Sequence, residues 1–358
     1  MTVDEPPTRL IHDARNTAVW PIRPEHFITP ANAFFTRSHG TIPRIDAATW
    51  RLEVGGLVDR PASFSLEELL RRFPRREVTA TLVCAGLRRA ELLSAGPLPG
   101  ELPWGPEPAS TGRWAGIALG DVLRAVGVSE RAGYVELTGL DEVERGGARF
   151  GFGGSIDLAK ALGPEVLLAH ELDGDALPTV HGFPLRALVP GWIGARSVKW
   201  LGRITLSAAP STNYFQSQAY RLQREGDPRN PRDVSAGVAL TEAPLNAVIV
   251  EPAAGQVVAA GQLRVRGWAM GSGGRQLRQV ELSPDDGQRW MAAHLTTHGP
   301  DWTWGFWEAV LELKPGERTL VVRATDTTGR MQPATVAETW NVKGYNNNAW
   351  HRVTLQVE

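Results

Sequence analysis

The sequence predicts an α+β domain followed by an all-β sandwich. Strand and helix patterns are mixed without regular alternation over roughly the first 220 residues, which favours α+β over a doubly wound sheet. A polar segment rich in Pro and Arg follows at 221–243, and short strand patterns separated by turns fill the remainder. Because a single core stops growing at about 250–300 residues, a chain of 358 residues suits two domains. We expect domains at 1–235 and 236–358.

Composition excludes several classes of protein. Apolar residues make up 42% of the chain and charged residues 22%, which is typical of a globular protein. The net charge of −1 argues against nucleic-acid and membrane-surface binding, and no apolar run is long enough to span a membrane. A single cysteine excludes an intrachain disulfide and any cysteine-rich zinc or iron–sulfur site. The acidic, Pro-rich start MTVDEPPTRL is unlike a secretory leader, so we expect a cytoplasmic protein unless a leader has been removed.

Local patterns define the elements of the first domain. Residues 1–33 are rich in Pro and resemble an extended arm. A helix should begin at Ser65, which forms a capping box with Glu68, and end at Pro74. A second helix should span about 119–126, with Gly127 as its stop signal. Strands are expected at 50–54, 79–83, 135–137, 166–172, 177–180, 185–189 and 198–206, with a hairpin turn at Asp173-Gly174.

The second domain contains only strand patterns. They lie at 247–250, 263–269, 279–282, 289–294, 304–313, 319–324, 335–340 and 351–357. Turn signals such as Lys314-Pro315-Gly316 separate them, and no helix periodicity is present. We therefore expect an immunoglobulin-like sandwich. The 13 tryptophans suit a β-rich protein with large aromatic anchors.

Cys84 ends the strand at 79–83 and is followed by a small turn, Ala85-Gly86, and by Arg88 and Arg89. Two adjacent positive charges favour thiolate character, and a thiolate is a soft ligand for a soft metal. A small buried core residue is the plainer interpretation of the same pattern, with the arginines as surface charges.

Basic side chains recur beside glycines along the first domain. Arginine forks bind oxyanions through paired, charge-assisted hydrogen bonds, whereas a single surface arginine is more often simply solvated. The set comprises Arg37, His39, Arg88, Arg89, Arg113, His181, Arg186 and Lys199. Because the whole chain is nearly neutral, their convergence would create a localised anion site.

Five motifs in order carry a family resemblance. They are FFTRSHG, TATLVCAGLRR, STGRWAG, HGFPLRALVPGWIGARSVKWLGRI and NAWHRV. Together they resemble the sulfite oxidase family of molybdopterin enzymes over nearly the whole chain from about residue 25. The second domain resembles that family's dimerisation domain.

The resemblance implies a molybdenum–molybdopterin cofactor with Cys84 as the metal ligand from the protein. The positions that match pterin-binding segments are Phe35, Thr36, Arg37, Ser38, His39, Asp141, His181, Arg186, Ser197, Val198 and Lys199. The positions that match the anion pocket over the metal are Arg37, Arg89, Trp104 and Tyr220, with Arg352 as a further pocket arginine. His181 as a core histidine, Tyr220 as a linker anchor and Trp104 as plain packing are the structural alternatives.

The implied reaction is oxidation of sulfite to sulfate. The sulfur lone pair would attack an oxo group of the metal, and an external acceptor such as a cytochrome would then remove the electrons singly. The chain contains no CxxCH heme motif, so no heme is expected in it. A homodimer is expected, because two-fold pairs are the commonest assembly.

One departure from the family pattern leaves the substrate open. Leu87 stands where the family usually has Asn in CAGNRR, so one hydrogen bond near the metal is lost or supplied elsewhere. The alternatives are a reductase of nitrate, a sulfoxide or another oxyanion on the same cofactor, and an inactive interaction protein.

Overall fold

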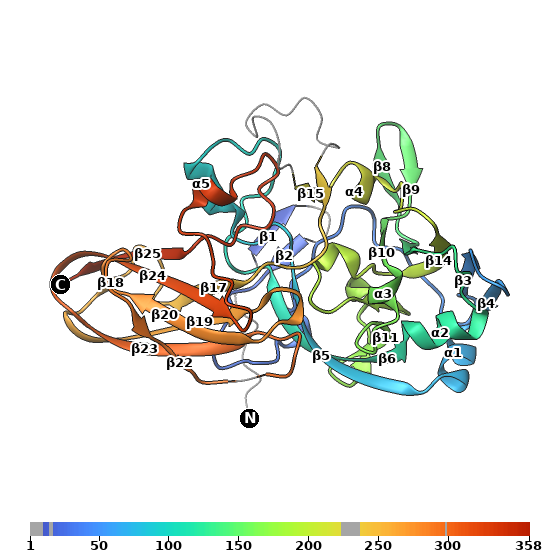
Figure 1. Ribbon diagram of the computed structural model, residues 1–358, viewed down its shortest axis with the longest axis horizontal. Helices are drawn as coiled ribbons and strands as arrows, with labels where there is room; N and C mark the ends of the chain where they lie inside the picture. The colour runs from blue at the N-terminus through green and yellow to red at the C-terminus, as the bar shows by residue number, and fades with distance from the viewer. Residues whose placement is uncertain (1–9, 14–16, 223–236, 298) are drawn as a thin grey trace.

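The computed structural model describes residues 10–13, 17–222, 237–297 and 299–358, which form two packed halves (Figure 1). The first half contains most of the helices, and the second half is a sandwich of long strands ending at the C-terminus. Two short strands, β15 (Arg221–Leu222) and β16 (Val238–Ala239), pair where the chain passes between the halves. The predicted boundary at 235/236 lies outside the described residues.

Two sheets form the body of the first half. The first has the order β10-β7-β14-β3-β4, with β14 parallel to β3. The second has the order β12-β11-β6-β5, with β13 paired to β11. Their bounds are β3 (Leu52–Gly56), β4 (Ala62–Phe64), β7 (Tyr134–Gly139), β10 (Gly153–Asp157), β14 (Leu201–Ser207), β5 (Arg75–Val83), β6 (Ala109–Ala118), β11 (Leu167–Leu172), β12 (Asp175–Ala176) and β13 (Arg186–Leu188).

Shorter elements complete this half. The helices are α1 (Leu66–Arg72), α2 (Leu119–Val126), α3 (Leu158–Ala161) and α4 (Tyr214–Ser217), and the remaining strands are β1 (Leu10–Asp13), β2 (Thr17–Val19), β8 (Val143–Arg145) and β9 (Ala148–Phe150). Both halves of the predicted capping box form at α1, where Ser65 Oγ accepts the Glu68 N–H and the Glu68 carboxylate accepts the Ser65 N–H. Gly127, at φ 75°, ends α2 as predicted.

The hydrophobic core of the first half lies between the two sheets and the helices. Leu137 and Ile204 from the first sheet contact a cluster that includes Ile117 and Leu168 from the second, and all four are essentially inaccessible to solvent. Burial of aliphatic side chains from both sheets stabilises their packing, at about 25 cal/mol per Å² of apolar surface.

The second half is a β-sandwich of two sheets, ordered β17-β19-β23-β22 and β18-β25-β24-β20-β21. The strands are β17 (Asn246–Glu251), β18 (Val257–Val258), β19 (Gly261–Met270), β20 (Leu277–Ser283), β21 (Met291–Ala292), β22 (His294–Leu295), β23 (Gly305–Leu313), β24 (Gly316–Asp326) and β25 (His351–Val357). Alternate residues of these strands, such as Leu320, Val322 and Ala324, fill the core between the sheets.

Three predicted strands differ from the structure. Residues 335–340 contain the short helix α5 (Val336–Thr339), which begins with a capping box between Thr335 and Glu338. The run at 289–294 divides into β21 and β22, which belong to different sheets. The turn at Asp173-Gly174 is confirmed, but the strand that follows it is only β12, not the predicted strand at 177–180. Pro178 lacks the N–H needed to extend the ladder, and a 3₁₀ turn at Thr179–His181 follows it.

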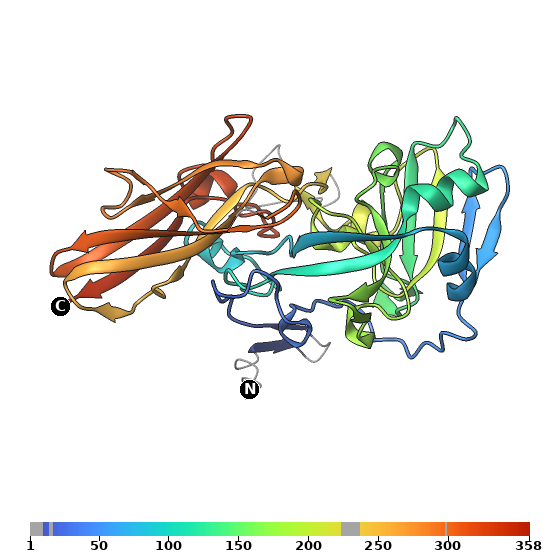
Figure 2. The same cartoon turned by 90° about the horizontal axis from the view of Figure 1, so that it is seen from below.

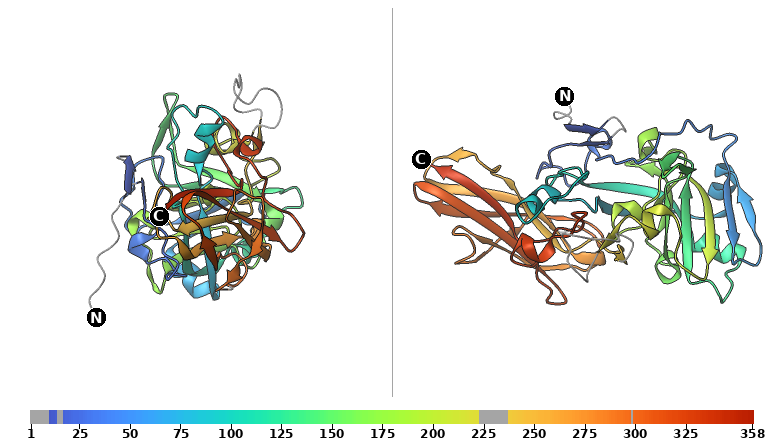
Figure 3. Two further views of the ribbon diagram at one scale, coloured as in Figure 1. Left: turned by 90° about the vertical axis from the view of Figure 1, so that its left-hand side faces the viewer. Right: turned by 90° about the horizontal axis from the view of Figure 1, so that it is seen from above.

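A long hairpin joins the two halves. Strands β5 and β6 pair from Arg75–Ile117 to Val83–Ala109, and in Figure 2 they run lengthwise from the first half toward the sandwich. Cys84 therefore lies where the halves meet. The segment 341–349, between α5 and β25, covers the loop after Cys84 from the sandwich side, and Figure 3 shows α5 beside that loop. Within the described residues, no helix is long and apolar enough to cross a membrane.

Candidate active site

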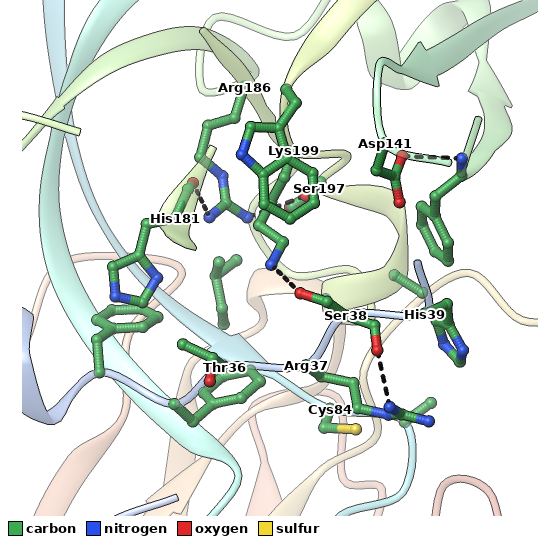
Figure 4. A pocket seen from close by; sticks show the side chains of 18 of the residues that line it. Thr36, Arg37, Ser38, His39, Cys84, Asp141, His181, Arg186, Ser197 and Lys199 are labelled. Atoms are coloured by element: carbon green, nitrogen blue, oxygen red, sulfur yellow. Dashed lines mark hydrogen bonds between the residues drawn. The ribbon is translucent and has the colours of Figure 1, made fainter. Parts of the chain in front are cut away.

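A pocket of about 730 Å³ opens beside Cys84. It is lined by one face of the segment 34–39, by the end of β5, and by the stretch between the 3₁₀ turn at 179–181 and β14. Figure 4 shows their side chains converging on one space. Twelve predicted site residues line it: Phe35, Thr36, Arg37, Ser38, His39, Cys84, Asp141, His181, Arg186, Ser197, Lys199 and Tyr220.

The segment 34–39 is held in extended form along the pocket. Thr36 exchanges backbone hydrogen bonds with Ala18, at 2.8 and 3.0 Å, and the Phe35 N–H donates to Ser110 Oγ at 3.1 Å. The Arg37 guanidinium donates to the Ser38 carbonyl at 2.9 Å. These bonds fix the backbone, so the polar side chains of the segment are positioned before any ligand binds.

Cys84 is partly exposed at the pocket wall. Its N–H donates to the Pro108 carbonyl at 2.9 Å, and its Sγ receives the Gly86 N–H at 3.4 Å. Figure 4 places the Arg37 guanidinium beside the sulfur. No group of three or more His, Cys, Asp or Glu side chains suited to a metal occurs among the described residues. A metal at Cys84 must therefore bring most of its ligands with it.

Two cations, the buried Arg186 and the half-buried Lys199, line the far side of the pocket. Arg186 donates to the carbonyls of His181, Ser197 and Ala187, and its guanidinium lies over the Trp114 ring. Lys199 Nζ donates to Ser38 Oγ at 2.8 Å and to the Val180 carbonyl at 3.0 Å. Burial lowers the pKa of Lys199 to about 7 and that of Arg186 to about 9.

The partners of both cations are neutral oxygens, with no carboxylate bonded to either in the described ranges. The charge of the nearby Asp141 carboxylate offsets that of Lys199 in part. Burial of the remaining positive charge is costly, so a pocket of this kind suits an anionic ligand. Burial and the charges of Lys199 and Arg186 lower the pKa of His181 to about 3, so its imidazole is neutral. A phosphate-bearing cofactor fits this arrangement.

Asp141, His39 and Tyr220 form a further part of the pocket wall. The Asp141 carboxylate accepts the Phe152 N–H at 3.0 Å, and burial raises its pKa. His39 Nε2 lies 2.8 Å from the Tyr220 hydroxyl, and its ring stacks on Phe152 with centroids 5.5 Å apart. Burial, together with the nearby Cys84 charge, raises the pKa of Tyr220 well above its usual value, so the phenol stays protonated at neutral pH.

Arg89 and Trp104 lie behind this wall rather than on the pocket lining. The Arg89 side chain is 6% exposed and donates to the carbonyls of Gly344 at 3.2 Å and Leu102 at 3.1 Å. Its guanidinium packs against Gly86, where an added Cβ would lie 2.7 Å away. Arg89 therefore does not line the pocket, but it contacts the loop that bears Cys84.

Four further predicted positions do not contribute side chains to the pocket. Arg88, in left-handed backbone at φ 58°, points into the junction between the halves and pairs with Glu91. Arg113 is exposed beside Asp173. Arg352 is on β25 and bonds Asp286 and the Ala334 carbonyl, away from the pocket. The Val198 side chain is in the core, with its carbonyl accepting from Ala187.

Several residues near the site carry no motif signal. The Tyr345 ring stacks on Tyr220, with centroids 5.2 Å apart, and lies under the Arg89 guanidinium. Glu101 lies 3.7 Å from Arg89, and the Asn346 N–H donates to the Ala85 carbonyl at 2.7 Å. These contacts join residues far apart in the chain, so no local pattern could indicate them.

Comparison with known proteins shows which domains and relatives the chain matches. Residues 39–215 match the oxidoreductase molybdopterin binding domain, and residues 238–358 match the Mo-co oxidoreductase dimerisation domain. The sulfite oxidase of Gallus gallus is 40% identical over 338 residues, which are 92% of this chain and 73% of that protein. The chain belongs to the sulfite oxidase family. It is an oxidoreductase, and its cofactor is the molybdenum–molybdopterin group.

Other relatives in the family differ in activity and length. A nitrate reductase of Hordeum vulgare is 36% identical over 92% of this chain and 39% of its own length. The sulfane dehydrogenase SoxCD of Paracoccus pantotrophus matches with a TM-score of 0.80 and 25% identity, over 98% of this chain and 88% of that one. The chain spans 62% of the mitochondrial sulfite oxidases of Homo sapiens and Rattus norvegicus.

Proposed function

We propose that this enzyme oxidises sulfite to sulfate and passes the electrons to an external acceptor. The observation that carries the proposal is the Arg37 guanidinium beside the Cys84 sulfur in the pocket, which Tyr220 also lines. A cation next to the metal ligand suits an oxyanion substrate. The sulfite oxidase of Gallus gallus, at 40% identity, supports the choice of sulfite.

The residues divide into three roles: binding the metal, holding the anionic part of the cofactor, and binding the substrate. Cys84 would bind the metal, and Arg186, Lys199 and neutral His181 would hold the anionic part of the cofactor at the far end of the pocket. The cofactor supplies the redox chemistry when bound, and the protein supplies position and field. Loss of a buried cation should therefore reduce retention of the cofactor before it changes the chemistry.

Arg37 would neutralise the oxyanion and orient it toward Cys84. The phenol of Tyr220, protonated at neutral pH, would donate a hydrogen bond, and His39 would orient that hydroxyl through the bond at 2.8 Å. Product release frees this anion site for the next substrate.

A homodimer and a separate electron acceptor complete the proposal. The match to a dimerisation domain supports a homodimer through the sandwich. Sulfite and water yield sulfate, two protons and two electrons, so an acceptor that takes one electron at a time must bind twice per turnover. A one-electron carrier such as a cytochrome suits this. Light scattering tests the assembly, and a monomeric mass at working concentration would contradict it.

Nitrate reduction is the second candidate, supported by the Hordeum vulgare relative at 36% identity. The Leu87 side chain packs in an apolar cluster with Val83 and Trp268 and is not among the residues that line the pocket. Steady-state assays separate the two. Sulfite with ferricyanide as acceptor should give turnover, and nitrate with a reduced viologen should give much less. Turnover of nitrate without turnover of sulfite would overturn the proposal.

A further inference from the structure

An acidic side chain stands between two cations behind the anion pocket. Glu101 lies in the Pro-rich loop before β6, with its Oε2 3.7 Å from Arg89 and its Oε1 2.9 Å from Lys343 Nζ. Its side chain is 19% exposed, so water screens it only in part. Lys343 comes from the sandwich, so the carboxylate bridges the two halves of the molecule.

This bridge is connected to the pocket by packed aromatic rings. The Arg89 guanidinium lies 5.3 Å from the centroid of Tyr345, which stacks on Tyr220 in the pocket wall. Burial is the main cause of the raised pKa of both phenols, and the nearby negative charge of Glu101 adds to it by disfavouring the phenolate. The Glu101 charge therefore acts electrostatically on the pocket itself.

The charges of this cluster can be summed. Arg89 and Lys343 contribute two positive charges, and Glu101 cancels one of them. An anion bound beside Cys84 thus meets a net charge of +1, rather than +2, from Arg89, Lys343 and Glu101 together. Since Coulomb energy scales with the charge of the ligand, this cancellation penalises a dianion twice as much as a monoanion.

We propose that Glu101 is a specificity-determining residue whose carboxylate acts as a fixed counter-ion, weakening the binding of doubly charged oxyanions relative to singly charged ones. This inference rests on the proposed function, because it takes the pocket beside Cys84 as the substrate site. Glu101 would favour the singly protonated form of a sulfur oxyanion as substrate, and it would speed release of a dianionic product such as sulfate.

Glu101 could instead serve only to hold Arg89 in place. The two roles predict opposite signs. Loss of a counter-ion tightens anion binding, whereas loss of a structural support lets Arg89 move and weakens it. Glu101→Gln keeps the length of the side chain and one acceptor for Lys343 while removing the charge, so it separates the two roles.

The experiment measures equilibrium binding of inorganic sulfate and of nitrate to the cofactor-loaded enzyme by calorimetry, independently of turnover. In Glu101→Gln, the sulfate Kd should fall at least about threefold, and the fold-change for sulfate should be about the square of that for nitrate. Lys343→Gln should weaken sulfate binding, because Glu101 then pairs with Arg89 alone. The double variant should return close to the wild type.

Glu308→Gln is the matched control for net charge. It breaks an arginine–glutamate pair with Arg264 on an exposed face of the sandwich, and its sulfate Kd should stay at the wild-type value. An unchanged or raised Kd in Glu101→Gln, or an equal change for both anions, would overturn the proposal. Because binding is measured without turnover, absence of sulfite oxidation would overturn the proposed function and leave this result standing.

Discussion

Replacing Lys199 with Met should stabilise the cofactor-free protein and abolish retention of the cofactor. Lys199 is enclosed by protein, keeps partial access to the pocket, and bonds only the neutral oxygens of Ser38 and Val180. Its pKa is lowered from 10.5 to about 7 because the charged amine is poorly solvated. In the cofactor-free protein this charge is a cost, and in the loaded protein it would bind an anion.

The cost follows from the difference in pKa between the folded and unfolded chain. At about 1.4 kcal/mol per pH unit, a fall from 10.5 to about 7 corresponds to about 5 kcal/mol. Water in the pocket and the loss of two hydrogen bonds reduce the net gain for Lys199→Met to about 2 kcal/mol. For a domain of this size, that raises Tm by about 5 °C.

The pH dependence gives a second signature. Below about pH 7 the amine is charged in both states, so the wild type carries the full cost there. Between about pH 7 and 10.5 the unfolded chain keeps the proton that the folded chain has lost, so wild-type stability rises with pH. Lys199→Met should lack this rise.

Calorimetric Tm of cofactor-free protein from pH 6 to 10 measures both signatures, and metal analysis of loaded protein measures retention. Lys160→Met is the matched control, because Lys160 is also buried but pairs with Glu165 at 2.7 Å. Removing it should lower Tm, since Glu165 is left unpaired. A lower Tm for Lys199→Met at pH 7, or full molybdenum content, would refute the reasoning.

Three further predictions concern the loop after Cys84 and its surroundings. Arg37→Met should raise KM for sulfite about 10- to 100-fold, because a charge-assisted bond is lost; unchanged steady-state kinetics would contradict this. Gly86→Ala should displace the Arg89 guanidinium, 2.7 Å from the new Cβ, and weaken sulfate binding measured by calorimetry, whereas Kd at the wild-type value would contradict it. Glu91→Gln should cost about 3–5 kcal/mol in denaturant unfolding, because buried Arg88 loses its counter-charge and keeps only neutral partners, Asn246 and the Ala349 carbonyl; a loss below about 1 kcal/mol would contradict this.

Much of the site could be predicted because its residues lie in sequence motifs that occur along this chain in the same order as in the sulfite oxidase family. Segment 34–39, Cys84 and the 181–199 stretch converge on one pocket although they are far apart in sequence. Arg88 shows the limit of such reasoning. It adjoins Arg89, yet its left-handed backbone sends its side chain into the domain junction, and no neighbouring residue signals this.

The fold was predictable where local chemistry decides the structure. The capping box at Ser65 and the stop at Gly127 set helix ends through contacts a few residues apart. At α5 the same signal was present in Thr335 and Glu338, but alternating apolar residues favoured a strand. Contacts across the two halves, such as Tyr345 on Tyr220 or Lys343 on Glu101, depend on tertiary packing and leave no local pattern.

We expect Cys84 to bind the metal of a sulfite-oxidising cofactor. The most direct test compares wild type with Cys84→Ala for molybdenum content, for the metal's sulfur neighbours by X-ray absorption, and for sulfite-dependent reduction of ferricyanide. Stoichiometric molybdenum and sulfite-dependent activity are expected in the wild type. In the variant, one sulfur neighbour of the metal and all activity should disappear. An unchanged sulfur shell, or a variant that still oxidises sulfite, would contradict it.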